Sequence, residues 1–248
     1  MADAKYRNFG HYIRDGWSAE PKQTFVALAD HLLEERGGHV TGKLLDIGCA
    51  TGELIGYLST RFPQLKCTGV DLIEDVLVQA RVNLPGVEFV QGSALALPPH
   101  YRDRFDIVTV MGVASVFDDT EIEAFWRSVI AVTKPGGTIA VLSPLNEYGV
   151  DTVIRHRKRR DGAPLAWETG WNVYAIETVQ EMVTALGASL RLERFRFQGT
   201  LERRPDPVRT WTLATAENPQ QLTNGLKLLV DHYFMLVRKP ARAEEGAE

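Results

Sequence analysis

The chain has 248 residues, of which 44% are hydrophobic and 24% are charged, and this composition argues against disorder, a collagen-like repeat or a coiled coil. Its two cysteines, Cys49 and Cys67, are too few for a disulfide framework or a zinc site, so we expect a cytoplasmic protein that uses no metal. The formal net charge of −4 argues against a nucleic-acid-binding protein, whose surface is usually basic overall.

Neither a membrane span nor a signal peptide is expected. No stretch approaches the roughly 18 consecutive apolar residues that a membrane span needs. The first ten residues carry charges with no apolar run behind them, unlike a signal peptide. Residues 241–248 combine small residues with glutamates, and we expect this tail to be disordered.

The first half of the chain alternates predicted helices and strands. Apolar residues at helical spacing predict a helix over residues 21–36, and the short apolar run of residues 43–47, which stops at a glycine, predicts a buried strand. The same patterns predict helices near residues 54–62, 76–80 and 122–130, and strands over residues 66–70, 87–90, 105–110 and 138–142, the last after a turn at residues 135–137. Strands separated by such helices predict a parallel sheet that is covered on both faces.

The second half is less regular. Residues 144–176 show no clear periodicity and include a basic run at residues 155–160. A helix and two strands are then predicted over residues 177–186, 189–197 and 233–238. The two strands are separated by a long polar insertion near residues 198–230.

Two strand ends carry the first signs of chemistry. The first strand ends in Asp46-Ile47-Gly48-Cys49-Ala50-Thr51-Gly52, where Gly48 permits a tight turn with its backbone close to a ligand. The second strand ends at Asp71, where a carboxylate can accept hydrogen bonds from both hydroxyls of an adenosine ribose. Because ligands bind beyond the carboxyl ends of the strands in an open parallel sheet, the two features together predict an adenosine-containing ligand.

The glycine spacing selects among such ligands. A dinucleotide site uses G-x-G-x-x-G to cradle pyrophosphate, whereas this chain has G-x-x-x-G with Ala50 at the intermediate position. Asp46, two residues before Gly48, would repel a phosphate but can anchor an amino group. We therefore expect a ligand with an ammonium group and no phosphates.

This segment resembles motif I of the class I S-adenosylmethionine-dependent methyltransferases, and further matches follow in the family's order. They are Gly69-Val70-Asp71, residues 91–98, Phe105-Asp106-Ile107-Val108, Lys134-Pro135-Gly136-Gly137 and residues 233–239. The resemblance is close over residues 40–143 and holds in outline over residues 175–239. It implies an α/β fold with a doubly wound, mostly parallel seven-stranded sheet, helices on both faces and an antiparallel C-terminal strand.

The resemblance also implies a cofactor, S-adenosylmethionine (SAM), with S-adenosylhomocysteine (SAH) as its product. We expect one methyltransferase domain over residues 1–240. Within it, residues 1–40 would form an N-terminal cap, residues 41–143 the cofactor-binding half, and residues 144–240 the acceptor-binding half.

Cofactor-binding residues are carried over from the family. By resemblance, Gly48, Ala50 and Gly52 line the methionine moiety, with Asp46 beside them, and Asp71 holds the ribose. The adenine-side and neighbouring residues are then Leu72, Ser93 and Ala94, with Met111 beneath the cofactor. Tyr12 and Trp17 would cap the sulfonium by aromatic contact, or else serve as packing anchors.

Two positions depart from the family pattern. Ala50 stands where the family usually has glycine, and Ser93 stands where it usually has aspartate. We expect weaker cofactor binding rather than its loss, because one hydrogen bond contributes only about 0.5–1.5 kcal/mol.

Acceptor-binding residues are expected in the segments without clear periodicity. Asn146, Glu147 and Tyr148 directly follow the fifth predicted strand, and Trp211 could stack a ring or pack in the core. Glu147 and His156 are the candidate bases, although His156 lies in the basic run and is interpreted as a solvated residue. The basic run is interpreted as an exposed charged helix face, with binding of an anionic acceptor as the alternative.

The sequence favours methyl transfer to an O or N atom of a small molecule, such as a sugar or a secondary metabolite. Methylation of nucleic-acid bases is disfavoured because the fourth strand runs into Met111-Gly112-Val113-Ala114, without an Asn/Asp-Pro-Pro-aromatic motif. A non-catalytic SAM-binding or partner protein on the same fold is the alternative, and the missing third glycine disfavours a nicotinamide-dependent oxidoreductase. The acceptor and the oligomeric state stay open.

Overall fold

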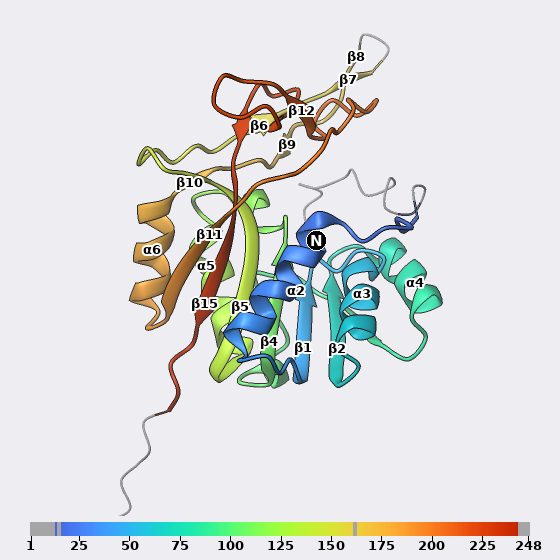
Figure 1. The fold of residues 1–248 in the computed structure, drawn as a ribbon, viewed down its shortest axis with the longest axis vertical. Helices are drawn as coiled ribbons and strands as arrows, with labels where there is room; N and C mark the ends of the chain where they lie inside the picture. The colour runs from blue at the N-terminus through green and yellow to red at the C-terminus, as the bar shows by residue number, and fades with distance from the viewer. Residues whose placement is uncertain (1–12, 14–15, 161–162, 243–248) are drawn as a thin grey trace, which may run out of the picture.

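The computed structural model describes residues 13, 16–160 and 163–242, and its centre is a twisted sheet with strand order β11-β15-β5-β4-β1-β2-β3 (Figure 1). These strands are β1 (Gly42–Ile47), β2 (Leu65–Asp71), β3 (Glu88–Gln91), β4 (Phe105–Met111), β5 (Thr133–Asn146), β11 (Ser189–Phe195) and β15 (His232–Arg238). Strands β1 to β5 pair in parallel, whereas β15 is antiparallel to both of its neighbours, β5 and β11. The predicted mostly parallel seven-stranded sheet with an antiparallel C-terminal strand is confirmed.

Helices cover both faces of this sheet, as predicted (Figure 1). They are α2 (Gln23–Glu35), α3 (Glu53–Arg61), α4 (Glu74–Asn83), α5 (Ile122–Val132) and α6 (Ile176–Ala185), with 3-10 turns η1 (Pro99–Tyr101) and η2 (Ala114–Val116). Strand β1 shows how the faces divide, because Leu44 packs with α2 and α3 while Leu45 packs with α5 and α6. The apolar stripe predicted over residues 122–130 is the buried face of α5, with Phe125 and Trp126 fully enclosed.

Strand β5 is longer than the sequence pattern predicts. The predicted turn at residues 135–137 lies inside β5, where the pairing with β4 shifts register between Phe105 and Ile107. At its other end β5 continues to Asn146, four residues beyond Leu142, which pairs with Met111 at the end of β4. The prediction of a strand over residues 138–142 therefore identified only the centre of β5.

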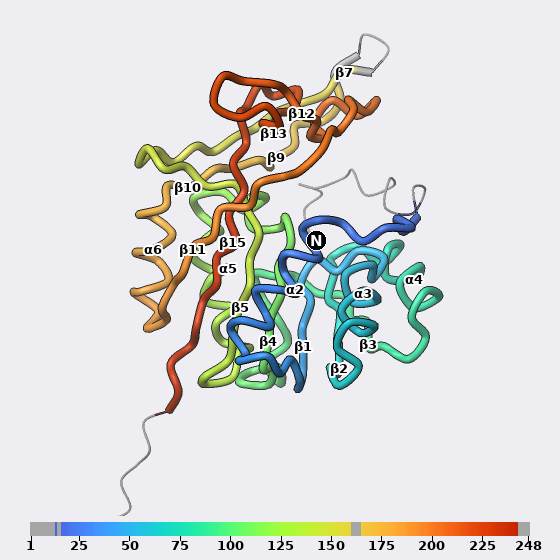
Figure 2. The backbone as a smooth tube through the Cα atoms, viewed as in Figure 1, coloured from blue at the N-terminus to red at the C-terminus, as the bar shows by residue number. Residues whose placement is uncertain are grey.

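The segments predicted to be irregular form a cap of short strands above the carboxyl ends of the sheet (Figures 1 and 2). The cap strands are β6 (Arg155–His156), β7 (Arg159–Arg160), β8 (Ala163–Pro164), β9 (Glu168–Thr169), β10 (Tyr174–Ala175), β12 (Trp211–Leu213), β13 (Gln221–Thr223) and β14 (Leu229–Val230). The basic run thus consists of β6, β7 and the two residues between them, and its interpretation as a helix face is wrong. The guanidinium groups of Arg155 and Arg157 lie 5.8 and 5.0 Å from the ring centre of Trp167.

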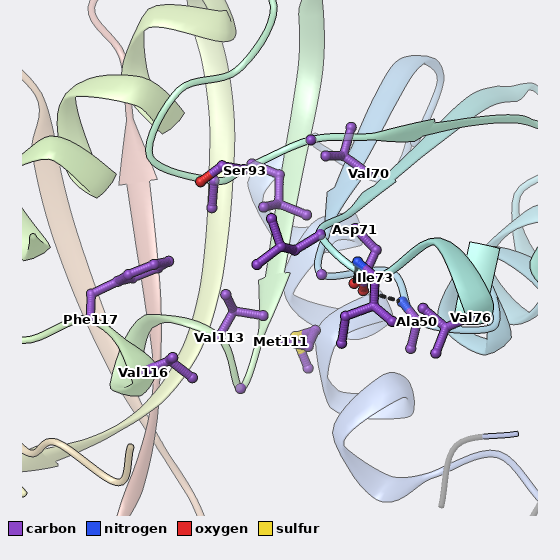
Figure 3. Close-up of a pocket in the computed structure, with 16 residues that line it drawn as sticks. Ala50, Val70, Asp71, Ile73, Val76, Ser93, Met111, Val113, Val116 and Phe117 are labelled. Carbon is purple, nitrogen blue, oxygen red and sulfur yellow. Dashed lines mark hydrogen bonds between the residues drawn. The ribbon is translucent and has the colours of Figure 1, made fainter. Parts of the chain in front are cut away.

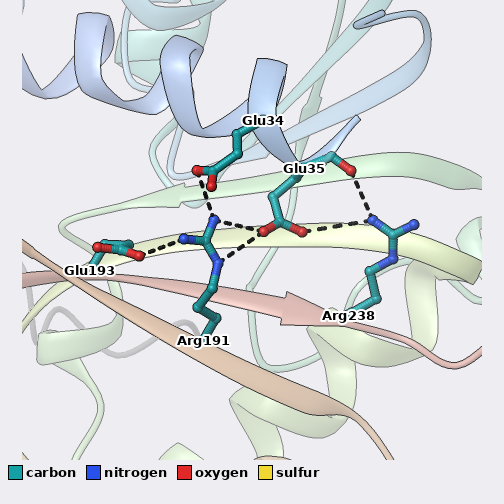
Figure 4. Close-up of polar contacts among 5 residues, drawn as sticks. All are labelled: Glu34, Glu35, Arg191, Glu193 and Arg238. Carbon is teal, nitrogen blue, oxygen red and sulfur yellow. Dashed lines mark hydrogen bonds and ion pairs between the residues drawn. The ribbon is translucent and has the colours of Figure 1, made fainter. Parts of the chain in front are cut away.

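Helix α2 is held against the edge of the sheet by a cluster of charged side chains (Figure 4). Arg191 of β11 contacts Glu34 at 3.1 Å, Glu35 at 2.7 Å and also Glu193. Arg238 of β15 donates a hydrogen bond to the backbone carbonyl of Glu35 at 3.0 Å. These contacts join the first described helix to the last strands of the chain, and so place α2 beside the site described below.

The last described residues of the chain contact the domain. Arg242 pairs with Asp103 at 3.2 Å, so the described part of the expected tail is in contact with the domain, and residues 243–248 lie outside the described residues. No helix among the described residues combines the length and the apolar character that crossing a membrane requires.

Candidate functional site

Two adjoining cavities lie at the carboxyl ends of β1, β2 and β4, under the cap. The first cavity has a volume of about 150 Å³, and Figure 3 shows its lining residues, which come from the ends of these strands, from the segments that follow them and from the segment after β3. The second cavity, of about 410 Å³, reaches from the same loops to the cap and to α2. The residues that line both are Gly48, Ala50, Met111, Gly112 and Val116.

The turn after β1 brings the backbone close to both cavities. Gly48 has a φ of +75°, and a Cβ atom at this position would lie 2.3 Å from the Val113 side chain. Ala50 has a φ of 46°, a left-handed conformation that costs a non-glycine residue about 1–2 kcal/mol. The turn therefore needs glycine at position 48 and holds alanine at position 50 under strain.

Asp71 holds this turn in place from the end of β2 (Figure 3). Its Oδ2 accepts a hydrogen bond from the Ala50 amide at 2.9 Å, and its Oδ1 accepts one from the Ile73 amide at 3.0 Å. Burial raises the pKa of Asp71, and the amide donors oppose that shift. Each carboxylate oxygen has a second lone pair, so the group can still accept hydrogen bonds from two ligand hydroxyls in the first cavity.

Asp46 lies beneath the second cavity and is almost fully enclosed. Its Oδ1 accepts a hydrogen bond from the Thr109 hydroxyl at 2.7 Å. Burial raises the pKa of Asp46 to about 7, the Thr109 hydrogen bond opposes the shift, and the charge of Asp71 adds to it. A buried carboxylate with this pKa is well suited to receive a cationic group of a ligand.

The far side of the first cavity is apolar with one small polar group. Leu72 is 41% exposed and lines the cavity together with Ser93, Ala94 and Phe117. The Ser93 hydroxyl accepts a hydrogen bond from the Leu95 amide at 3.2 Å. This wall can hold a flat heterocycle between aliphatic side chains, with Ser93 and backbone groups at its edge.

Residues 44–137 match the family model described as a methyltransferase domain. Residues 44–137 of this chain therefore carry a methyltransferase domain. Trans-aconitate 2-methyltransferase of Paracidovorax citrulli is 32% identical over 123 residues, which are 50% of this chain and 45% of that protein. The chain therefore spans less than half the length of this curated relative.

Solved structures share this fold over nearly the whole chain. 1,6-Didemethyltoxoflavin-N1-methyltransferase of Burkholderia thailandensis, with SAH bound, has a TM-score of 0.57 at 16% identity, covering 93% of this chain and 83% of that chain. A SAM-bound amino pentose methyltransferase of Micromonospora echinaspora has a TM-score of 0.56 at 17% identity, covering 96% and 99%.

The predicted cofactor residues of the methyltransferase domain largely gather at the two cavities. Those lining at least one cavity are Asp46, Gly48, Ala50, Asp71, Leu72, Ser93, Ala94 and Met111. Gly52 instead begins α3 with a φ of +82°, and its missing Cβ makes room for Phe89. Gly52 thus shapes the turn without lining either cavity.

The predicted aromatic cap is not brought together with this group. Tyr12 lies outside the described residues. The Trp17 indole donates a hydrogen bond to the Thr51 hydroxyl at 3.2 Å, and its ring lies against Gly56, where a Cβ would be 2.7 Å away. Among the described residues, Trp17 therefore packs on α3 and lines neither cavity, as the packing alternative expects.

Most of the predicted acceptor residues lie away from the second cavity. Asn146, Glu147 and Tyr148 line a separate hollow beside Arg194 and Asp231. Trp211 lines neither cavity, and its ring lies 5.3 Å from the guanidinium of Arg203. The structure thus does not join these four residues to the predicted cofactor site.

His156 is the exception, because it lines the second cavity. Only 11% of its side chain is exposed, so its interpretation as a solvated residue is wrong. His232, at the start of β15, lines the same cavity and was not predicted as a site residue. The sequence offers one signal for His232: it directly precedes the apolar segment Tyr233-Phe234-Met235-Leu236-Val237.

Proposed function

We propose that the chain transfers a methyl group from SAM to an O or N atom of a small molecule by in-line displacement. One observation carries this proposal: the first and second cavities share a wall made by Gly48, Ala50, Met111 and Gly112. A donor in one cavity and an acceptor in the other would meet at this wall. Methyl transfer requires such contact, with the reacting atoms about 3–3.5 Å apart.

The residues of the first cavity fit SAM, together with Asp46, which lines the second cavity two residues before the shared Gly48. Asp71 would accept hydrogen bonds from the ribose hydroxyls, and Leu72 and Ser93 would face the adenine. Gly48 leaves space for the methionine chain, and Asp46 would receive its ammonium group. When bound, SAM supplies a methyl group already activated by a sulfonium, so the chain's own residues need only bind, orient and exclude water.

The acceptor would bind in the second cavity, with residues 41–143 serving mainly the donor and residues 144–240 mainly the acceptor. The names of the similar proteins support a small-molecule acceptor, since they specify trans-aconitate, a toxoflavin precursor and an amino pentose. The closeness of the cap to the sheet supports the exclusion of water during transfer. We propose a cytoplasmic enzyme.

A non-catalytic SAM-binding protein is the alternative, and the substituted positions 50 and 93 are its motivation. The Ala50 amide nevertheless donates a hydrogen bond to Asp71, as an intact ligand-binding turn requires.

The experiment on the proposed function compares SAM, SAH and NAD as stabilisers of the purified chain in thermal unfolding. We expect SAM and SAH at about 100 times their Kd to stabilise it by about 2.7 kcal/mol, and NAD to have no effect. Stabilisation by NAD alone would contradict the proposal.

Replacing Ser93 by aspartate tests the placement of the adenine. An aspartate can still accept the hydrogen bond that the Leu95 amide now donates to the Ser93 hydroxyl. It also adds an acceptor for the adenine amino group. We therefore expect Ser93→Asp to leave SAH affinity unchanged or to raise it by up to about tenfold. Calorimetry with SAH measures this, with Ser59→Asp as a control on α3. A tenfold loss at position 93 alone would show that Ser93 does not face the adenine.

A further inference from the structure

The second cavity holds a histidine whose ring nitrogens are unoccupied. His156 lies on β6, opposite Glu168 of β9 in the antiparallel pair. Both ring nitrogens are buried, and neither makes a hydrogen bond to a described residue. Because buried polar atoms in proteins are nearly always hydrogen-bonded, an unpartnered imidazole that lines a cavity points to a ligand that completes it.

The charges around His156 suit proton acceptance. Its Nε2 lies 3.8 Å from a carboxylate oxygen of Glu168, and Lys158 lies 3.7 Å from the same carboxylate and 3.6 Å from Asp206. Burial lowers the pKa of His156; Glu168 and Asp206 oppose this, and Lys158 adds to it. The imidazole is therefore neutral near pH 7. The carboxylate of Glu168 lies close enough to stabilise the imidazolium that forms when His156 accepts a proton.

The same cavity offers a cation and an aromatic wall. Arg209 is half-buried, lines the cavity, and forms no ion pair with any residue that the structure describes. Trp171 has a φ of 62°, a conformation rare for an aromatic residue, and its ring lies 6.4 Å from that of His232. The neighbouring Asn172 is fully buried and bonded to the Phe117 carbonyl at 2.8 Å, which fixes this strained segment to the domain. Strain held in this way is frequent at ligand-binding sites.

We propose that the acceptor is a flat organic anion with an O–H or N–H nucleophile, that Arg209 binds its anionic group, and that His156 takes the proton from its nucleophile. This proposal rests on the proposed methyl transfer. The nucleophilic oxygen or nitrogen forms a bond to the methyl carbon while the carbon–sulfur bond breaks, and the bonding pair stays on sulfur. The proton of the nucleophile moves to the imidazole of His156, and the positive charge passes from the sulfonium to the imidazolium beside Glu168.

The binding part of the proposal is tested on the full chain saturated with SAH, with 4-hydroxybenzoate as the probe. We expect 4-hydroxybenzoate to bind at least ten times more tightly than its uncharged methyl ester, and Arg209→Gln to remove this preference. Arg203→Gln, on the cap but outside both cavities, is the matched control. Equal affinities for the acid and the ester, or no binding of either at millimolar concentration, would overturn the anionic acceptor class.

The catalytic part is tested by single-turnover transfer of a deuterated methyl group from labelled SAM to 4-hydroxybenzoate. We expect His156→Asn to slow transfer by about 100-fold or more while SAH affinity stays within about threefold, and His39→Asn to match the wild type. Glu168→Gln should move the acidic limb of the rate profile to lower pH, because Glu168 raises the pKa of His156. An unchanged rate in His156→Asn would refute the role of His156.

A separate readout distinguishes the failure of this proposal from that of the proposed function. SAH binding is measured in every variant by the same calorimetry. If SAH binds normally and the acid is neither bound nor methylated, the assignments of His156 and Arg209 fail while SAM binding stands. If SAH does not bind to the wild type, the proposed function itself fails.

Discussion

Replacing Asp71 by alanine is expected to weaken SAM and SAH binding by about 100-fold or more. The carboxylate would lose two charge-assisted hydrogen bonds to the ribose hydroxyls, each contributing about 1.5–3 kcal/mol. It would also lose its bond to the Ala50 amide, which holds a strained left-handed residue in the turn. Both losses act on the same cavity, so the effect on affinity should exceed that of any other single substitution in its wall.

Two further variants make the result specific. Asp75 is an exposed carboxylate in the first turn of α4, and Asp75→Ala should bind SAH as the wild type does. Asp71→Asn keeps one oxygen that can accept the Ala50 amide, so it separates support of the turn from recognition of the ribose. Calorimetry with SAH measures all three affinities. Equal affinities of Asp71→Ala and Asp75→Ala would show that Asp71 does not bind the ribose.

The cofactor half of the fold was predictable because its signals are local. A buried parallel strand is apolar on both faces, so it appears in the sequence as a short apolar run that ends at a glycine or an aspartate. Residues 43–47 have this pattern and form β1, and residues 66–70 end at an aspartate and form β2, with Asp71 at the cavity. The site residues follow directly from such strand ends, since the sheet brings them to one edge.

The cap was not predictable because its strands have only two or three residues and pair across the chain. No periodicity can emerge from two residues such as Arg155 and His156, and the burial of the His156 side chain depends on Glu168, which opposes it in the pair. The basic composition of the run therefore suggested solvent, whereas the pairing encloses His156.

The acceptor residues predicted after β5 were displaced by the length of that strand. β5 runs on past Leu142, which pairs with Met111 at the end of β4, and then pairs with β10 at Leu145 and Asn146. The residues that follow are thereby carried above the level at which β4 ends, into the hollow beside Arg194. The predicted turn at residues 135–137 lies inside the strand, and nothing local in the sequence marked the end of the strand at Asn146.

Asp46→Asn is expected to stabilise the ligand-free chain at pH 8. The pKa of Asp46 is about 7 in the folded chain because of its burial, against an ordinary value of 3.8. Between these values the folded state holds a proton that the unfolded state releases, so this group's contribution to stability falls as the pH rises from about 4 to about 7. The difference corresponds to at most about 4 kcal/mol. Asparagine carries no charge and can still accept the hydrogen bond of the Thr109 hydroxyl. Urea denaturation of Asp46→Asn should therefore show a free energy of unfolding about 2–4 kcal/mol higher at pH 8 and little changed at pH 4.

The same substitution should weaken SAM binding, because the wild-type carboxylate becomes charged only above about pH 7 and then receives the ammonium group. Wild-type affinity should therefore rise from pH 6 to pH 8, and Asp46→Asn should lose about tenfold or more at pH 8 with a flat pH profile. Thr109→Val removes the hydrogen bond that lowers the pKa of Asp46, so it should move the wild-type midpoint to higher pH. Calorimetry with SAM across this range measures all three profiles.

A variant that is more stable at pH 8 yet binds SAM normally would show that burial of Asp46 serves something other than the ammonium group. A variant that gains stability and loses affinity would show that this domain keeps an unfavourable buried carboxylate because its ligand needs the charge.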